Sequence, residues 1–298
     1  MVAVVGATAS GKSELSLDLA QRLRGEIVNS DAMQVYRGMD IGTAKLPVDD
    51  RRGIPHHLLD LLDVDEPATV AQFQAMAREV VEDCRSRGAT PVLVGGSALY
   101  TRAVLDGFEF PGTDAALRAR FESELADVGA AALHARLAAL DAEAAARILP
   151  GNARRVVRAL EVISLTGRPF SAALPEPAYV HPRTVQVGVR IPRPVLDQRI
   201  EERVRRMWEA GLVDEVRRLA DAGLREGRTA KRALGYQQVL AMLDGELTEQ
   251  EAFDRTVSGT RRFARRQDSW FRKDGRVVWV DWDDPARVDQ AVDACAAA

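Results

Sequence analysis

The 298-residue chain has few of the side chains that build disulfides or metal centres. Its two cysteines, Cys84 and Cys295, are too few for a disulfide framework or a structural zinc site. The four histidines are scattered and show no metal-binding pattern; they are His56, His57, His134 and His181. These shortages exclude a small disulfide-stapled domain and a zinc-organised fold.

The chain also lacks long apolar runs and an excess of positive charge. No run approaches the ~20 apolar residues that a membrane-spanning helix needs. No targeting segment precedes the first predicted strand, so we expect a soluble, cytoplasmic protein with no membrane partner. The formal net charge is -3, and a mildly acidic protein binds nucleic acid only through a local basic patch.

Strand and helix patterns alternate in the N-terminal part of the chain. Short apolar runs predict buried parallel strands, and apolar residues at helical spacing predict helices. In chain order we predict a strand over 1–5, a helix over 13–23 closed by Gly25, a strand over 26–29, a helix over 70–87 and a strand over 91–94. This alternation predicts an α/β fold with a parallel sheet covered on both faces, and ligands beyond the carboxyl ends of its strands.

The pattern changes near Phe110 to an Ala-rich stretch without strand signals. Residues 113–166 predict three or four helices, with caps at Asp114, Asp141 and Asn152. Strand character returns at 185–191, followed by a helix from Pro194 to about Ala210 and a late strand over 277–280. We therefore predict a P-loop α/β core, built from residues 1–110 and 179–298, with a helical insertion at 111–178.

A phosphate-binding loop joins the first predicted strand to the first helix. The segment fits the pattern G-x-x-x-x-G-K-[ST] in full, in the required strand–loop–helix context. Glycines let the backbone wrap a phosphate, and the exposed N–H groups and the helix dipole favour an anion. The lysine adds a charge, and the last hydroxyl is a candidate Mg²⁺ ligand. The predicted phosphate-binding residues are Gly6, Ala7, Thr8, Ala9, Ser10, Gly11, Lys12 and Ser13, with Ser13 as the candidate metal ligand.

The loop predicts a bound diphosphate or triphosphate without saying which. A nucleotide hydrolase usually has an acid at the end of a later buried strand, where it positions Mg²⁺. Here the strand over 91–94 ends in Gly95-Gly96-Ser97 instead, and the acid nearest the loop is Asp31. A small-molecule kinase with Asp31 as its base therefore stays open as an alternative.

Seven segments, in order over nearly the whole chain, resemble the tRNA dimethylallyltransferase (isopentenyltransferase) family of bacterial type. They are residues 6–13 (GATASGKS), 30–36 (SDAMQVY), 40–45 (DIGTAK), 55–60 (PHHLLD), 94–100 (VGGSALY), 158–162 (RALEV) and 234–236 (LGY). The family usually has Pro where Ala7 stands and Thr where Ser97 stands, and neither departure changes the expected function.

The resemblance implies a nucleotide-kinase-like core and an inserted helical domain that grips the anticodon stem-loop of tRNA. It implies transfer of a dimethylallyl group from dimethylallyl diphosphate to N6 of the adenosine 3′ of the anticodon, with Mg²⁺ as cofactor and diphosphate as product. We expect a monomer. A non-enzymatic P-loop RNA-binding protein and an enzyme that prenylates free AMP are further alternatives, and the large insertion argues against the second.

Three residues are predicted to be catalytic: Asp31, Ser97 and Arg203. On the family match and its position after a strand, Asp31 is the general base that takes the proton of a weakly nucleophilic amine; binding Mg²⁺ or capping a helix is its alternative role. Ser97 is expected opposite the phosphate loop, where preorganised donors stabilise charge on the leaving diphosphate; its alternative is a helix cap.

Arg203 lies on the helix predicted from Pro194. The apolar residues Leu196, Ile200, Val204 and Met207 form a stripe on this helix, and Arg203 falls on its edge. An inward arginine needs an anionic partner, which the resemblance identifies as the diphosphate. A structural ion pair is the alternative. Arg199 and Arg206 are expected further round, toward solvent.

The tRNA-binding surface is predicted from the resemblance and from basic clusters. The target base must leave its stack to reach a buried electrophile. Solvated surface charge is the alternative for each cluster, and above all for Arg261, Arg262, Arg265 and Arg266. No role follows for His56 and His57. The predicted tRNA-binding residues are Asp31, Ala32, Met33, Gln34, Ser97, Arg154, Arg155, Val156, Val157, Arg158, Arg232, Gly235, Tyr236 and Gln237.

Overall fold

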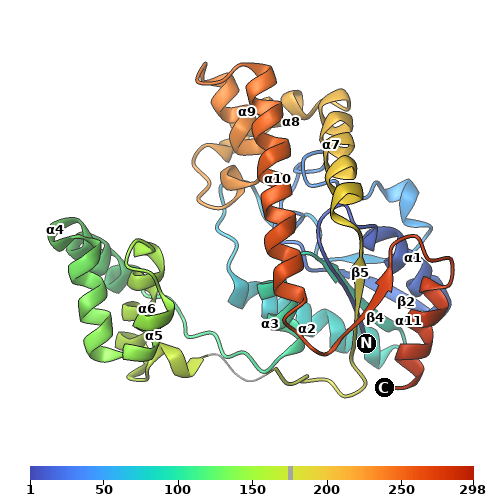
Figure 1. Ribbon diagram of the computed structural model, residues 1–298, viewed down its shortest axis with the longest axis horizontal. Helices are drawn as coiled ribbons and strands as arrows, with labels where there is room; N and C mark the ends of the chain where they lie inside the picture. Colours follow the sequence, from blue (N-terminus) through green and yellow to red (C-terminus); the bar gives the residue numbers. More distant parts are fainter. Residues whose placement is uncertain (174–176) are drawn as a thin grey trace. The chain divides into compact units, whose positions relative to one another are not determined.

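The computed structural model describes residues 1–173 and 177–298 (Figure 1). These residues form two compact units. The first, which we call the core, comprises Met1–Leu105 and Tyr179–Ala298, and the second, the helical unit, comprises Asp106–Ala178. The helical unit begins slightly before the predicted insertion at 111–178, of which residues 174–176 lie outside the described residues.

The core is built on a parallel sheet, as predicted. In the described part of the chain the sheet has the order β3-β2-β4-β1-β5-β6, and every neighbouring pair is parallel. Its strands are β1 (Val2–Val5), β2 (Gly25–Asn29), β3 (His56–His57), β4 (Thr90–Gly95), β5 (Val185–Arg190) and β6 (Val277–Asp281). Because β4 lies between β2 and β1 and all three strands are parallel, the loops that follow them meet at one edge of the sheet.

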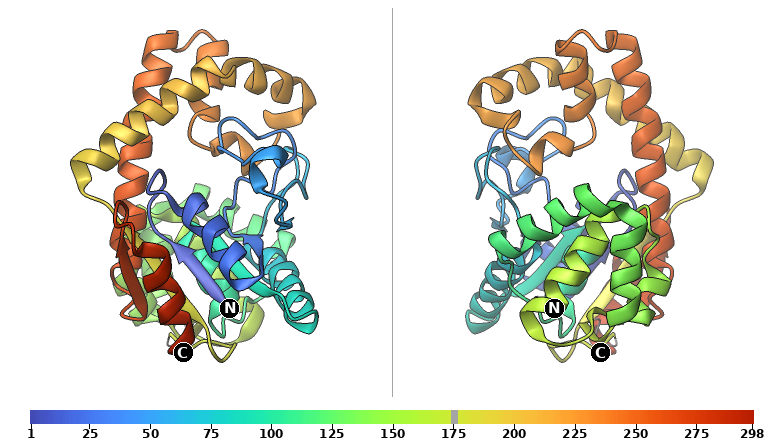
Figure 2. Two further views of the ribbon diagram at one scale, coloured as in Figure 1. Left: turned by 90° about the vertical axis from the view of Figure 1, so that its right-hand side faces the viewer. Right: turned by 90° about the vertical axis from the view of Figure 1, so that its left-hand side faces the viewer.

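Helices cover both faces of this sheet, because successive strand residues point to opposite sides. Val2 and Val4 of β1 pack in one hydrophobic cluster with α1 (Lys12–Leu23) and α11 (Arg287–Ala296), which lie together in Figure 2. Ala3 and Val5 pack in the other cluster with α2 (Val70–Ser86) and α3 (Ala98–Leu105).

A second group of core helices follows β5. Pro194 lies in the first turn of α7, as predicted, and the long helix α10 packs against α7 and α9 (Figure 1). The helices are α7 (Arg193–Glu209), α8 (Leu212–Leu219), α9 (Tyr236–Leu243) and α10 (Glu249–Phe271), with short helical turns at Val48–Arg51, Ala220–Leu224 and Ala230–Arg232.

The helical unit has its own hydrophobic cluster, which includes Phe121, Leu133 and Leu160. Its helices begin where the sequence predicts caps: the side chains of Asp114 and Asp141 accept hydrogen bonds from the first turns of α4 and α5. The helices are α4 (Ala115–Leu140, kinked at Gly129), α5 (Ala142–Arg147) and α6 (Ala153–Thr166), followed by a short turn at Phe170–Ala173.

Two details of the fold bear on the sequence predictions. Gly25 does not close α1: the residue in the left-handed conformation is Arg24, with φ 50°, and Gly25 already belongs to β2. Glycine is needed at position 25 because a Cβ there would lie 2.5 Å from the carbonyl oxygen of Thr90 on the neighbouring strand. Among residues 1–173 and 177–298, no helix is both long and apolar enough to cross a membrane.

Candidate functional site

The candidate site lies at the carboxyl ends of β1, β2 and β4. The loop over residues 6–13 leaves β1, Asp31 follows β2, and Ser97 follows β4. Three segments far apart in the sequence therefore converge, because β4 is hydrogen-bonded to β1 on one side and to β2 on the other. This convergence is the arrangement that a parallel sheet predicts for a ligand site.

The phosphate loop has the backbone that its glycines allow. Gly6 and Gly11 have φ 137° and φ 100°, values that L side chains rarely adopt, and α1 begins directly after Gly11. Lys12 Nζ donates a hydrogen bond to Ala7 O at 2.7 Å, so the lysine folds back over its own loop. Ser13 is exposed in the first turn of the helix, where free N–H groups face an anion.

A cleft of about 630 Å³ opens beside this loop, between residues 9–14, residues 40–47 and the inner side of α7. Arg203 is half-buried in its wall, and its Nη1 donates to Thr8 Oγ1 at 3.5 Å. Burial lowers the pKa of Arg203, while the Asp31 carboxylate acts in the opposite direction. Burial, reinforced by Arg203, also lowers the pKa of Lys12 to about 7. Cations held in a poorly hydrated place favour the binding of an anion.

Two further arginines of α7, Arg199 and Arg206, line the same cleft. The sequence predicts both further round, toward solvent, which holds for the exposed Arg206 but not for Arg199. Arg199 is half-buried, and its guanidinium lies 5.1 Å from the ring centroid of Trp282. Arg206 is exposed and also lines the cleft. The apolar stripe of α7 does not predict that Arg199 lines a cleft, because the opposite walls of the cleft come from residues 9–14 and 40–47.

Asp31 is fixed by a short hydrogen-bonded turn. Its Oδ1 accepts from the backbone N–H of Met33 at 2.9 Å, and its own N–H donates to Asn29 Oδ1 at 2.8 Å. Asn29 Nδ2 in turn donates to Leu58 O at 3.0 Å, which ties the turn to the chain after β3. A half-buried carboxylate held in this way has the fixed orientation that a general base needs.

The segment at 40–45, on the other side of the cleft, is held by two buried charges that sequence reasoning missed. Lys45 Nζ bonds Asp40 Oδ1 at 2.5 Å and Asp60 Oδ1 at 2.6 Å. Glu215 of α8, 2% exposed, accepts hydrogen bonds from the backbone N–H groups of Asp40, Ile41 and Gly42. Glu215 shares the buried stripe of α8 with Leu212, Val216 and Leu219, and a glutamate in an apolar stripe is the signal that could have identified it.

The residues predicted to bind tRNA in the helical unit differ in exposure. Arg154 and Arg155 are exposed on the first turn of α6. The side chains of Val156 and Val157 are buried in the core of the unit, so any RNA contact of these two residues would be through the backbone. Arg158 is half-buried and bonds Glu161 at 2.9 Å and the carbonyl oxygen of Pro111 at 2.7 Å, so its guanidinium has partners within the unit, and its tRNA contact stays a prediction.

The predicted tRNA-binding residues near α9 divide in the same way. Arg232 and Gln237 are exposed, whereas Gly235 and Tyr236 are buried. Tyr236 Oη donates to Glu215 at 2.6 Å, and its ring leaves no room for a side chain at position 42, where a Cβ would lie 2.4 Å from Tyr236 Cε2. The Tyr236 side chain therefore supports the segment at 40–45, and the tRNA contact of this residue stays a prediction.

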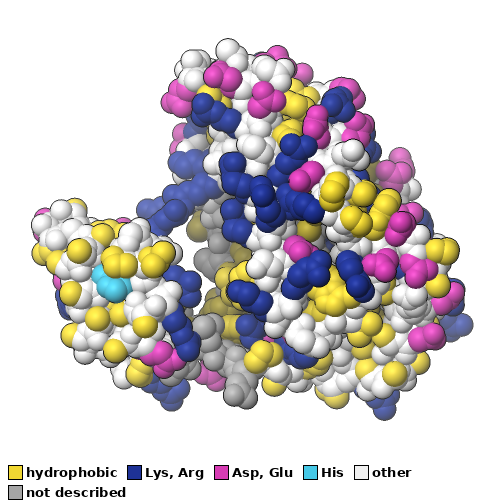
Figure 3. All heavy atoms as spheres, viewed as in Figure 1, with side chains coloured by type: hydrophobic (Ala, Val, Ile, Leu, Met, Phe, Trp, Pro, Cys, Tyr) yellow, Lys and Arg dark blue, Asp and Glu magenta, His cyan; other side chains and the backbone are white. Residues whose placement is uncertain are grey.

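Figure 3 shows Lys and Arg side chains gathered over α10. Arg262, Arg265 and Arg266 are exposed there. Arg261, predicted in the same stripe, turns instead toward α7, where its Nη2 lies 2.8 Å from Glu201. Three of the four predicted arginines thus present charge to solvent, and one belongs to a network of ion pairs.

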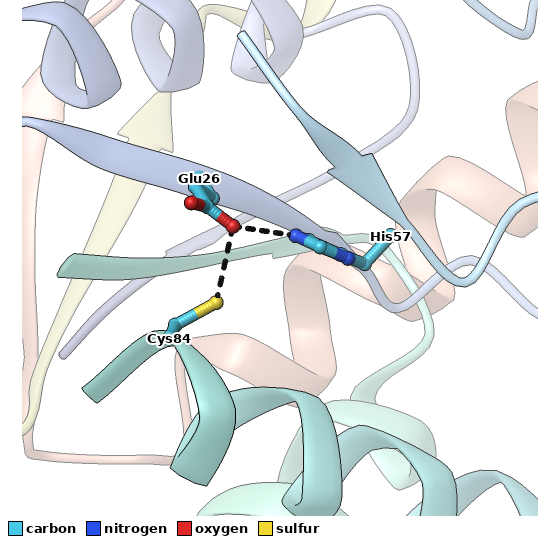
Figure 4. A group of neighbouring side chains, drawn as sticks. All are labelled: Glu26, His57 and Cys84. Carbon is cyan, nitrogen blue, oxygen red and sulfur yellow. Dashed lines mark hydrogen bonds and ion pairs between the residues drawn. The ribbon is translucent and has the colours of Figure 1, made fainter. Parts of the chain in front are cut away.

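A different cluster occupies the amino end of β2, away from the strand ends that carry the site. Glu26 accepts from His57 Nε2 at 2.7 Å and from Cys84 Sγ at 3.5 Å (Figure 4). The atoms of these three side chains that could ligate a metal ion lie within 4.8 Å of one another. Both Glu26 oxygens, however, also accept hydrogen bonds from Arg87, at 2.6 and 2.9 Å. These bonds hold the pKa of Glu26 at about 2. We assign the cluster as a structural ion-pair network, which gives His57 a role.

A phosphate loop at the edge of a parallel sheet, with cations and a fixed carboxylate around it, is the arrangement of an enzyme with the P-loop kinase-like fold. The sequence profile described as IPP transferase matches residues 34–274. The chain belongs to this family.

Proteins similar to this chain share one described activity. A protein named tRNA dimethylallyltransferase from Nocardioides sp. is 68% identical over 297 residues, covering 100% of this chain and 96% of the relative. The full-length tRNA isopentenylpyrophosphate transferase of Bacillus halodurans is 39% identical, with a TM-score of 0.71, over 99% of this chain and 98% of that one. A eukaryotic dimethylallyltransferase acting on tRNA is 26% identical, with a TM-score of 0.84, over 99% of this chain and 77% of that one.

Proposed function

We propose that this transferase moves a dimethylallyl group from dimethylallyl diphosphate to N6 of the adenosine 3′ of the anticodon in tRNA. The observation that carries the proposal is that the phosphate loop and Arg203 line one cleft, with the Asp31 carboxylate near enough to act on the charges of Lys12 and Arg203, in a chain of the IPP transferase family. Family membership replaces the kinase alternative, because this family transfers a prenyl group to tRNA rather than a phosphoryl group.

We propose a part in the reaction for each group. The bond between C1 of the allyl chain and the diphosphate oxygen breaks, and its electron pair leaves with the diphosphate. Lys12, Arg203 and the loop N–H groups stabilise the charge that builds on this leaving group. N6 of adenine forms the new bond to C1 and loses one proton, which passes to the carboxylate of Asp31 and then to water. Ser97 adds a hydroxyl at the end of β4.

A magnesium ion fits this arrangement, and we propose it as the cofactor. Mg²⁺ in phosphate sites is held by few protein oxygens together with phosphate oxygens and water. Ser13 is exposed on the cleft at the start of α1, and its hydroxyl is a ligand of the required chemistry. When bound, the ion would neutralise charge on the leaving diphosphate.

We further propose that the tRNA is bound by exposed groups of both units, and that the protein acts as a monomer in the cytoplasm. The exposed candidates are Arg154 and Arg155 on α6, together with Arg232 and Gln237 near α9. Asp31, Ala32, Met33, Gln34 and Ser97 remain the proposed contacts to the flipped base. Gln34 Nε2 donates to Thr43 O at 3.1 Å, which ties this segment to the cleft wall.

Incubation of the protein with Mg²⁺, unmodified tRNA and dimethylallyl diphosphate labelled in its allyl chain tests the proposal directly. Label in the RNA, at the adenosine 3′ of the anticodon, is the expected result. Transfer of phosphate from ATP to a small acceptor, without labelled RNA, would replace the proposal by the kinase interpretation. Binding of tRNA without any label transfer would support a non-enzymatic role.

Binding of diphosphate is expected to take up a proton at Lys12. The pKa of this lysine is lowered to about 7 in the free protein, so at pH 8.5 the free side chain is largely neutral. A bound anion favours the charged form, so affinity should fall by up to about tenfold per pH unit above pH ~7. Calorimetric titration with pyrophosphate at pH 8.5, in buffers of different ionisation enthalpy, should show uptake approaching one proton.

The matched control for this titration is Lys12→Arg, because an arginine stays charged throughout this pH range. Protons that belong to pyrophosphate itself appear in both proteins, so the difference between the two reports Lys12 alone. Equal proton uptake by the wild type and the variant would show that Lys12 is already charged in the free site.

If Arg154 and Arg155 of α6 contact RNA phosphates, the salt dependence of tRNA binding should weaken when they are removed. Replacing Arg154 and Arg155 together by alanine should lower the slope of log affinity against log salt by roughly 0.7 to 0.9 for each phosphate that these arginines neutralise. The control is Arg147→Ala in the same unit, since Arg147 is exposed but paired with Glu143 at 2.6 Å. Filter binding at several salt concentrations measures the slopes, and equal slopes for all three proteins would remove α6 from the interface.

A further inference from the structure

Gln267 is a buried polar residue of α10 that lies against the phosphate loop. Its side chain is 6% exposed. Ala264, one helical turn earlier on the same face, is fully buried in an apolar cluster with Ala7 of the loop and Ile200 of α7. This packing brings α10 close enough to the loop for the Gln267 amide to reach its backbone.

The amide of Gln267 joins two separate parts of the candidate site. Its Oε1 accepts a hydrogen bond from the backbone N–H of Thr8 at 2.8 Å. Its Nε2 donates to the carbonyl oxygen of Gly96 at 2.9 Å. One bond requires an acceptor and the other a donor, so only one orientation of the amide satisfies both. Among the residues that the structure describes, Gln267 thus connects the end of β1 with the end of β4.

The second contact also accounts for glycine at position 96. A Cβ on Gly96 would lie 2.2 Å from Gln267 Nε2 and 3.3 Å from Gly6 O. The turn before Ser97 is therefore pressed between the amide and the start of the phosphate loop. Any side chain at this position would push the amide away from Gly96 O.

We propose that Gln267 is a positioning residue for prenyl transfer, which fixes the distance between the phosphate loop and Ser97 without contacting the substrate. The proposal rests on the proposed function. Thr8 is held on its backbone by Gln267 and on its hydroxyl by Arg203. Gly96 directly precedes Ser97. The buried amide therefore sets the distance between the phosphate-loop donors on one side of the leaving diphosphate and the Ser97 hydroxyl on the other.

Such an amide matters because donors stabilise a transition state only when they are already in place. A displacement of about 1 Å in a reacting group can cost roughly 100-fold in rate. Removal of the Gln267 hydrogen bonds should therefore lower kcat more than it raises the KM for tRNA, because the exposed arginines proposed to bind tRNA lie on other elements, α6 and the turn before α9.

The test compares Gln267→Glu and Gln267→Met with the same two substitutions at Gln250. Gln250 lies in the first turn of the same helix, is exposed and bonds only to Asp254 in the described residues. At pH 8 both Gln267 variants should lose about 10- to 100-fold in kcat, while the Gln250 variants stay within about twofold of wild type. Thermal unfolding of each variant separates a loss of stability from a loss of turnover.

The pH dependence distinguishes a positioning amide from a residue that only fills space. The carboxylate of Gln267→Glu faces Gly96 O with no proton to donate, whereas its acid form can donate. As pH falls, the ratio of this variant's kcat to that of wild type should rise, while the ratio for Gln267→Met stays flat. If the Glu variant does not fold, Gly96→Ala approaches the amide from the other side and should cause a loss of similar size.

Each outcome bears on a different claim. Wild-type protein that labels no tRNA would reject the proposed function. Active wild-type protein with Gln267 variants within about twofold in kcat would overturn the positioning role alone. A loss of equal size at every pH in the Glu variant would also overturn it, because the hydrogen bonds would then contribute nothing beyond packing.

Discussion

Asp31→Ala is expected to lower kcat for prenyl transfer by about 100- to 10,000-fold while leaving the affinity for tRNA within about twofold of wild type. The exocyclic amine of adenine is a weak nucleophile because its lone pair is delocalised into the ring. Asp31 is held by the N–H of Met33 and by Asn29 at the end of β2, so its carboxylate has one orientation. Single-turnover kinetics with saturating tRNA and dimethylallyl diphosphate measure the chemical step directly.

Asp31→Asn is the sharper variant, because its amide keeps the shape and the acceptor for the Met33 N–H but cannot take a proton. It should lose nearly as much turnover as Asp31→Ala with less disturbance of the turn. Asp49→Asn, on an exposed residue of the segment before β3, is the matched control. Unchanged turnover in Asp31→Asn would remove the carboxylate from the proton transfer and leave it a structural turn residue.

The strand-end loops of the core are predictable from sequence because each is a local pattern. The phosphate loop is recognised from eight consecutive residues, which include its glycines and lysine, and from the apolar strand just before them. Parallel strands also place their carboxyl ends at one edge of the sheet, so Asp31 is predicted at the same edge as the loop once β1 and β2 are recognised. The sheet order and the exact neighbours of each loop need the folded chain.

The contacts that hold the site together arise between distant segments and could not be predicted in the same way. Gln267 and Thr8 are 259 residues apart, and Glu215 and Asp40 are 175 apart. A polar residue in an apolar helical stripe signals a buried role but does not name its partner. Helical periodicity likewise located Arg203 but misplaced Arg199, whose surroundings come from other elements.

Segments that match a family do not separate residues that touch a substrate from residues that support those residues. Tyr236 lies in a matched segment and is fully buried, with its hydroxyl on Glu215. Lys45 lies in another, and it joins the matched segments at 40–45 and 55–60 through its ion pairs with Asp40 and Asp60. Only the burial and hydrogen bonding seen in the structure distinguish the residues that can contact a substrate from the residues that support them.

Glu215→Gln is expected to lower the free energy of unfolding by about 2 to 4 kcal/mol and to raise the KM for dimethylallyl diphosphate. The carboxylate accepts from three consecutive backbone N–H groups, those of Asp40, Ile41 and Gly42, and from Tyr236 Oη. A glutamine in its place has one acceptor oxygen and turns an N–H₂ donor toward other donors. Because Asp40 and Ile41 line the cleft beside the phosphate loop, the loosened segment should also weaken substrate binding.

Urea denaturation and steady-state kinetics of two further variants show which part of this loss comes from the carboxylate. Tyr236→Phe keeps the ring against Gly42 and removes one hydrogen bond, so it should cost only about 1 kcal/mol. Glu209→Gln, at the exposed end of α7, should change stability by less than about 0.5 kcal/mol. If Glu215→Gln were as mild as Glu209→Gln, the three N–H groups would be satisfied by water, and the cleft wall would owe its shape to Lys45 instead. A large loss of stability with an unchanged KM would contradict the second half of the prediction and show that the segment at 40–45 supports the fold without shaping the substrate site.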